Sequence, residues 1–317
     1  PEHMRASRPE RHPMVRTVLD PLSRRRFAPA ARWGSDQPFY DNFARLDGSA
    51  ALMGYDMKPL ERRFTRAIEA AYQKPMDWPI YWANPRPVFV PFLSHFSVGD
   101  LMDIRPSGPF ASGRSLALEP RPPLYLHENA EALPRVYAQD RIVEASADEQ
   151  MRELVGGDLR RGVFMIEPPA EAREGGEAVA SYRSCGAWTA LTASAEEAAR
   201  FRELQEKAVV SRIDYSRANA VVAECDFSSP AMLIFTDVWY PGWTARVDGR
   251  PADLHRVNYC QRGVWLAAGK HRVELAFLPP AVVSGGAVAL ASWAAVVLLS
   301  VGAALRRRGP ASAPGRR

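Results

Sequence analysis

The chain has 317 residues, of which 47% are hydrophobic, so it is long enough for two ordinary domains and too apolar for wholesale disorder. Its net charge of +5 comes mostly from arginines near the two ends. Without an RNP motif, zinc-finger spacing or a helix-turn-helix signature, this distribution favours a membrane surface over nucleic acid. We therefore expect no nucleic-acid partner.

The first 208 residues are expected to form two regions. Residues 1–32 are rich in arginine and lack hydrophobic periodicity, which indicates a flexible or connecting segment. Residues 33–208 are expected to be loop-rich and mixed α/β. Many of the 27 prolines cluster before residue 135, where they interrupt long helices and central strands.

Several secondary-structure elements are expected between residues 59 and 208. Apolar residues recur at helical spacing from Pro59 to Gln73 and predict an amphipathic helix. The segment ASAEEAARFRELQEKA fits either a surface helix or a long loop between strands. The other expected elements are a strand at 88–90 with a short helix after it, strands at 124–128 and 135–138, and a helix starting near Ser146 and ending at Gly156 and Gly157.

Residues 209–280 are expected to form an antiparallel, sandwich-like β domain, because short alternating segments are separated by turn signals. Asp248 and Gly249 can adopt positive φ angles and predict a tight hairpin turn. Gly269 predicts a second turn, after which Val273, Leu275 and Phe277 should face the core.

Residues 281–305 carry no charge and are expected to form a transmembrane helix. A helix of this length rises about 37 Å, against a hydrocarbon core of about 30 Å. Because Arg306, Arg307 and Arg308 follow at once, residues 306–317 are expected to be a cytoplasmic tail, and the preceding part lies outside the bacterial cytoplasmic membrane. The N-terminus lacks a signal peptide, so export would require preceding membrane helices that this chain lacks.

The cysteines and histidines form no recognisable metal or redox motif. Cys185, Cys225 and Cys260 are too far apart for a Cys-x-x-Cys pair, and the sequence HENAE lacks the second histidine of a zinc-protease motif. We expect neither a metal nor a cofactor. A disulfide between Cys225 and Cys260 fits the sequence, but separate buried thiols are favoured because free cysteine usually behaves as a core residue.

The segment LIFTDVWYPGWTARVDGRPADLHRVNYCQRGVWLAAGKHRVELAFLPP, followed by a terminal membrane helix, resembles the end of YfhO-type bacterial membrane proteins. LYLHENAEALPRVY is similar to the Y-x-N-x-x-A-L-P-R motif of that family, and GYDMKPLERRF to its Gly-Tyr-Asp segment. The matching positions are Tyr125, Asn129, Ala132, Leu133, Pro134, Arg135, Asp237, Tyr240, Pro241, Gly242, Trp243, Val247, Asp248, Gly249, Asn258, Tyr259, Arg262, Val264, Gly269, His271 and Val273.

The resemblance implies the extracytoplasmic C-terminal domain and membrane anchor of a protein similar to GT-C-type glycosyltransferases. That class uses polyprenyl-phosphate sugars to modify envelope glycans or lipids. Its catalytic carboxylate lies in an early loop between membrane helices that this chain lacks, so no catalytic residue is transferred. The chain alone is therefore expected not to be catalytic, and its implied partners are the lipid bilayer, upstream transmembrane helices, and a polyprenyl-linked sugar or envelope glycan.

The alternative is a non-catalytic, membrane-anchored β domain that binds envelope polysaccharide or protein partners. Trp239, Tyr240 and Trp243 could contact a glycan by stacking on sugar rings, or sit in an aromatic belt at the lipid interface. Packing at a corner of the sandwich is favoured, because Pro241 and Gly242 form a bend that large side chains would hold in place.

Charged residues of the same region suggest two further chemistries. Asp237, Asp248 and Asp253 lie near one another in the sequence and could supply the carboxylate pair of a glycosidase, although aspartates in a hairpin such as Asp248 and Asp253 are more typical of backbone hydrogen bonding in turns. Arg256 and Arg262 could meet a phosphate or an anionic head group, although arginines on a strand are usually solvated. We therefore expect structural roles for these residues.

Overall fold

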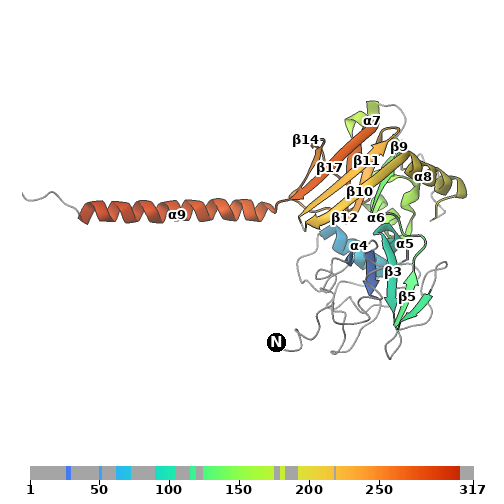
Figure 1. The fold of residues 1–317 in the computed structure, drawn as a ribbon, viewed down its shortest axis with the longest axis horizontal. Helices are drawn as coiled ribbons and strands as arrows, with labels where there is room; N and C mark the ends of the chain where they lie inside the picture. The colour runs from blue at the N-terminus through green and yellow to red at the C-terminus, as the bar shows by residue number, and fades with distance from the viewer. Residues whose placement is uncertain are drawn as a thin grey trace, which may run out of the picture.

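The computed structural model describes residues 26–29, 50–51, 62–72, 90–103, 115–118, 124–174, 179–182, 192–217 and 219–307. These residues form the α+β fold expected from the sequence, and one long helix, α9 (Pro280–Arg307), projects from it (Figure 1). Most of the predicted connecting segment, the Gly-Tyr-Asp segment and residues 308–317 lie outside the described residues.

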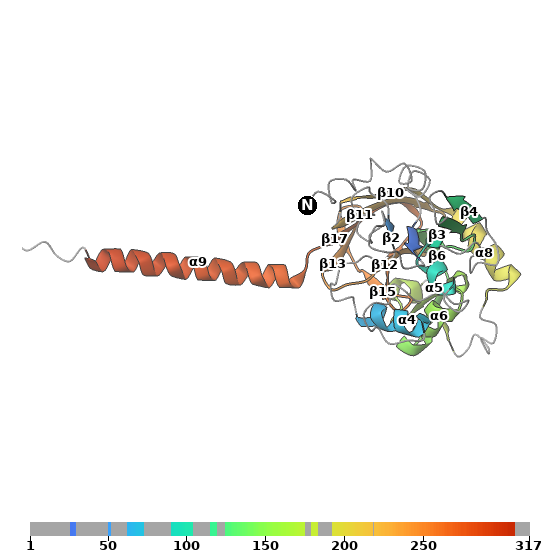
Figure 2. The same cartoon turned by 90° about the horizontal axis from the view of Figure 1, so that it is seen from below.

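Two antiparallel sheets pack face to face and form the expected sandwich (Figure 2). The outer sheet has the order β10 (Ala208–Arg217), β11 (Ala220–Phe227), β17 (Gly269–Phe277), β13 (Trp243–Val247) and β14 (Arg250–Ala252). The central sheet has the order β15 (His255–Val257), β16 (Gln261–Leu266), β12 (Ala231–Val238) and β6 (Val136–Gln139).

Strand β6 comes from the region before residue 209 and completes the central sheet. It pairs with β12 in an antiparallel register, with Val136 opposite Phe235 and Gln139 opposite Met232. The expected strand at 135–138 is thus present, and it belongs to the sandwich. The two regions of the chain share one sheet.

The central sheet is buried on both of its faces. One face packs against the outer sheet, and the other packs against a layer that contains α4 (Arg62–Tyr72), α5 (Val90–His95) and α6 (Ala147–Gly156). Every residue from 231 to 236 is consequently buried. A strand buried on both faces needs a continuous apolar run, which explains the sequence AMLIF where alternation would mark a half-exposed strand.

Most helices of this layer lie where the sequence predicts them. Helix α4 buries Phe64 and Ile68, as the amphipathic pattern predicts. Helix α6 starts with a capping box formed by Ser146 and Glu149 and ends at Gly157. The segment left open between helix and loop is a helix, α8 (Ala195–Lys207). At residue 90, where a strand was expected, α5 has already begun.

Three smaller groups complete the described chain. A mixed sheet has the order β2 (Ala50–Ala51), β1 (Arg26–Pro29), β3 (Val98–Asp103), β5 (Leu124–Glu128) and β4 (Ser115–Leu118). A parallel sheet has β7 (Ile142–Glu144) between β8 (Val163–Met165) and β9 (Val179–Ser181). The short helices are η4 (Leu159–Arg161) and α7 (Ala170–Glu174).

The predicted hairpin turns are confirmed. Asp248 and Gly249 have φ angles of 52° and 78° and join β13 to β14, which are the two positive values that a tight turn of this kind requires. Gly269 has a φ of 125° at the start of β17. Further along that strand, Val273 and Leu275 are fully buried, as expected, whereas Phe277 is half-buried and packs against the rings of Tyr240 and Trp243.

Cys225 and Cys260 are buried, free thiols. Cys225 lies in the core between the two sheets, whereas Cys260 belongs to the core on the opposite face of the central sheet. A disulfide between them would have to cross that sheet, so the alternative of two separate thiols is correct. Burial raises the pKa of Cys225 to about 11, which keeps this thiol protonated and weakly reactive.

Helix α9 contains a segment, Pro280–Val301, that is long and apolar enough to cross a membrane. Its 22 residues correspond to a rise of about 33 Å, close to the thickness of a hydrocarbon core. None of this segment is buried against the rest of the described chain. A soluble protein would have to cover such a surface, so the helix supports membrane association.

Candidate functional site

The turn from Trp239 to Trp243 packs on the chain that leads into α9. The carbonyl oxygen of Gly242 accepts a hydrogen bond from the N–H of Leu278 at 3.0 Å. Gly242 has a φ of 107°, and a Cβ atom there would lie 2.5 Å from the Leu278 oxygen and 3.0 Å from Cδ of Pro280. Only glycine fits this position, because the turn touches the first residue of the helix.

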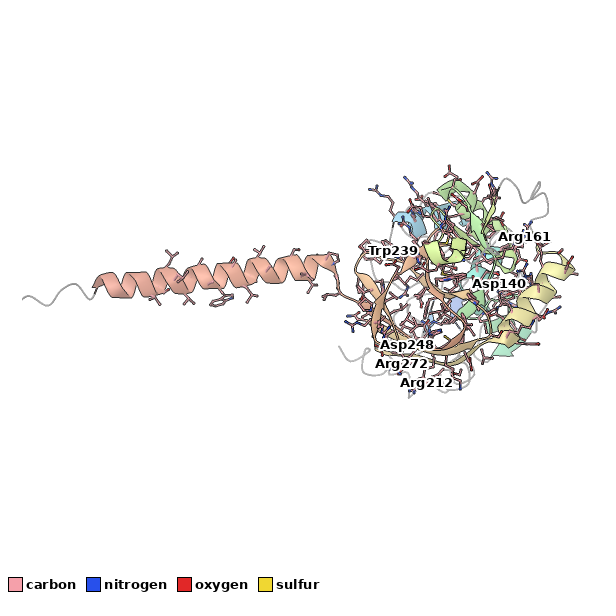
Figure 3. The ribbon with its side chains drawn as sticks, turned by 90° about the horizontal axis from the view of Figure 1, so that it is seen from above. Asp140, Arg161, Arg212, Trp239, Asp248 and Arg272 are labelled. Carbon is pink, nitrogen blue, oxygen red and sulfur yellow. The ribbon has the colours of Figure 1, made fainter. Side chains whose placement is uncertain are left out.

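Aromatic rings continue this contact towards α9. The Tyr240 ring lies 6.0 Å from the Phe277 ring in an edge-on arrangement, and the Trp243 ring lies 5.2 Å from it. Trp239 and Trp243 are half-buried, whereas Tyr240 is 38% exposed. Figure 3 shows Trp239 on the side of the body that faces α9. The turn therefore packs as a corner and also presents one aromatic ring to its surroundings.

Asp237 lies beside this turn, where β12 departs from regular pairing. The register between β12 and β16 shifts between Phe235 and Val238. Such a bulge can re-aim a side chain. The Asp237 carboxylate accepts a hydrogen bond from the Tyr215 hydroxyl at 2.8 Å. It also lies 3.4 Å from Nη2 of Arg135 and 3.3 Å from Nη2 of Arg262.

Arginine side chains stack on aromatic rings around the same carboxylate. The Arg135 guanidinium lies 3.5 Å from the centre of the Tyr215 ring, and the Arg262 guanidinium lies 4.0 Å from that of Trp243. Each such contact contributes about 0.5–2 kcal/mol. The Arg135 backbone is also fixed, because its carbonyl oxygen accepts hydrogen bonds from the backbone N–H and the hydroxyl of Thr236.

A third arginine stacks nearby, since the Arg256 guanidinium lies 4.9 Å from the centre of the Trp239 ring. We call this set the arginine-aromatic corner, in which two guanidinium groups, those of Arg135 and Arg262, meet one carboxylate and a third stacks on Trp239. It consists of Arg135, Tyr215, Asp237, Trp239, Tyr240, Pro241, Gly242, Trp243, Arg256 and Arg262.

The geometry of the corner favours anchoring over acid-base chemistry. The Asp237 carboxylate is only 14% exposed and is occupied by Tyr215, Arg135 and Arg262, so little of it is open to a substrate. Within the described ranges, no group of histidine, cysteine, aspartate and glutamate is arranged to hold a metal ion. The corner therefore fixes the positions of its charged and aromatic side chains.

The other suggested carboxylates, Asp248 and Asp253, lie elsewhere, and Asp253 is exposed between β14 and β15. Asp237 belongs to the corner before β13, whereas Asp248 forms the turn after β13. One oxygen of Asp248 accepts from the N–H of Arg272 and the other lies 2.8 Å from Nδ1 of His271. These contacts hold the pKa of Asp248 below its ordinary value. The structure does not bring the two carboxylates together as a glycosidase requires.

Several of the remaining residues of the matched motifs lie in the hairpins of the outer sheet or just before the corner. Gly249, Gly269 and His271 belong to the two hairpins at the end of the outer sheet that Asp248 and Arg272 mark in Figure 3. Pro134 is exposed and leads into Arg135. Neither group contributes a side chain to the arginine-aromatic corner.

Asn258 and Tyr259 form a buried turn on the helical side of the central sheet. Both have positive φ angles, 46° and 71°. The Asn258 side chain accepts from the N–H of Phe164 and donates to the Tyr137 hydroxyl and to Oε1 of Gln261. This network satisfies polar groups that burial would otherwise leave unpaired, and it ties three elements together.

Tyr215 is the corner residue that sequence reasoning missed. It lies on β10, 22 residues before Asp237, and the two meet only because the sheets face each other. The sequence around Tyr215 contains no motif that marks it. Its role follows from the packing of the two sheets against each other.

Comparison with known proteins identifies no relative of this chain. No protein-family model, curated protein or solved structure matches this chain. The resemblance to YfhO-type proteins therefore stays a prediction.

Proposed function

We propose that this chain is the extracytoplasmic C-terminal domain and membrane anchor of a YfhO-like integral membrane protein. In this proposal the whole protein serves envelope glycan or lipid glycosylation as a GT-C-type glycosyltransferase, with its catalytic core in membrane helices outside this chain. The observation that carries the proposal is the contact of Gly242 with Leu278 and Pro280. This contact joins the sandwich closely to the apolar helix.

The electrostatics of the corner support an accessory role for the domain. Asp237 is engaged by Tyr215, Arg135 and Arg262, which leaves it poorly suited to proton transfer. Arg135 and Arg256, which are both partly exposed at the corner, suit the phosphate of a lipid-linked sugar, because guanidinium groups recognise phosphate well. The sandwich would then position a substrate or a catalytic loop, and chemistry would take place in the membrane core.

The second candidate is a non-catalytic β domain that binds envelope polysaccharide. The exposed ring of Tyr240 favours it, because an aromatic face can stack on a sugar ring. Under this candidate, Tyr240→Ala should abolish binding of the full chain, held in lipid nanodiscs, to purified envelope polysaccharide. Val209→Ala, at another exposed apolar position, is the matched control and should leave binding unchanged.

A test of glycosylation begins with deletion of the gene in the source organism. Mass spectrometry of envelope glycans and glycolipids should then show the loss of at least one sugar modification, restored by the intact coding region. An unchanged profile would contradict a role in glycosylation. Polysaccharide binding by the full chain under that condition would favour the second candidate.

A further inference from the structure

We propose that the arginine-aromatic corner rests in the phospholipid headgroup layer of the outer leaflet, with Tyr240 and Leu278 as its points of contact. This inference depends on the membrane insertion of α9 in the proposed function. It goes further by assigning a lipid-binding surface to the folded domain. Leu278 is 58% exposed and Tyr240 is 38% exposed, and both lie next to the start of the helix.

The depth of the corner follows from its contact with the helix. The Gly242 turn touches Pro280, the first residue of a span whose rise of about 33 Å fills a hydrocarbon core of about 30 Å. The polar interface beyond that core adds about 5–8 Å on each side. A turn in van der Waals contact with Pro280 therefore lies within the interface.

The chemistry of the corner matches that layer. Tryptophan and tyrosine concentrate at membrane interfaces because their rings are apolar and their polar edges reach water or head groups. Arg256, which is partly exposed and stacked on Trp239, adds positive charge beside lipid phosphates. A lipid surface is favoured over a protein partner, because the covalent link to α9 holds the corner at this height.

The opposite end of the outer sheet provides an internal control. Val209 on β10 is 47% exposed and is in register with Lys270 through Asp226. Lys270 lies seven residues before Phe277 on β17, a separation of about 23 Å along an extended strand. Val209 is thus an exposed apolar residue that should stay in water.

The test uses nitroxide labels on single cysteines in the full chain, reconstituted in phospholipid nanodiscs. Cys185 is replaced with serine, and Cys225 and Cys260 are buried. Labels are placed by Tyr240→Cys and Leu278→Cys at the corner. Their collision rates with oxygen and with a water-soluble nickel chelate are measured by electron paramagnetic resonance, and circular dichroism checks that each variant is folded.

Two further labels make the outcome decisive, Val209→Cys as the aqueous reference and Val297→Cys within α9. We expect the labels at positions 240 and 278 to lose nickel-chelate collisions relative to position 209. Nickel access equal to that at 209, with position 297 shielded, would overturn this inference and leave the proposed membrane anchor intact. Nickel access at position 297 as well would overturn both.

Discussion

Replacing Gly242 with alanine should destabilise the sandwich more than any other single-methyl substitution in its turns. A non-glycine residue at positive φ costs about 1–2 kcal/mol. The added Cβ would also lie 2.5 Å from the carbonyl oxygen of Leu278 and 3.0 Å from Pro280. Backbone cannot swing aside as a flexible side chain can, and overpacking of this kind costs about 1–3 kcal/mol more. The expected loss is therefore about 2–5 kcal/mol of unfolding free energy.

Gly249→Ala is the matched control for this prediction. Gly249 also has a positive φ, 78°, but nothing lies within 4 Å of the position its Cβ would occupy. It should lose only the conformational part, about 1–2 kcal/mol. Both variants are unfolded with urea as the full chain in detergent micelles, and loss of near-ultraviolet circular dichroism reports on the folded domain. If Gly242→Ala were no less stable than Gly249→Ala, the turn would not be packed against the linker.

Two further substitutions probe buried polar contacts. Asp237→Asn should cost about 3 kcal/mol in the same urea assay, because it leaves the buried guanidinium of Arg262 without its carboxylate; a loss below about 1 kcal/mol, the range of an exposed pair, would contradict the ion pair. His95 has Nδ1 2.8 Å from the carbonyl oxygen of Leu154, while Nε2 accepts from the N–H of Leu159, so the buried ring is neutral and its pKa is lowered by burial. Stability that depends on the neutral ring is present above a pH of about 6.5 and falls as the pH drops below it; His95→Gln should flatten this slope between pH 7 and pH 5, and an unchanged slope would refute the assignment.

Local signals in the sequence predicted the parts of the fold that depend on neighbouring residues. The turn at Asp248 and Gly249 was predicted because both residues tolerate positive φ. The start of α6 was predicted because Ser146 and Glu149 satisfy each other's backbone groups within one turn. The residues that determine each of these elements lie within a few positions of one another.

Features that depend on distant contacts could not be predicted in the same way. The bend at Gly242 was expected, but its reason, contact with Leu278, involves a residue far along the chain. Tyr215 joins Asp237 only through the stacking of two sheets. The separation of Cys225 from Cys260 likewise follows from the central sheet lying between their cores.

The sidedness of the domain is the most direct test of the account. Val209→Cys in a Cys185→Ser background, expressed from the natural locus, provides one exposed thiol on the sandwich. Intact cells are treated with a membrane-impermeant maleimide, and the Cys185→Ser chain alone measures background labelling. We expect position 209 to be labelled fully before lysis. Labelling that occurs only after the cells are broken would contradict an extracytoplasmic domain anchored by α9.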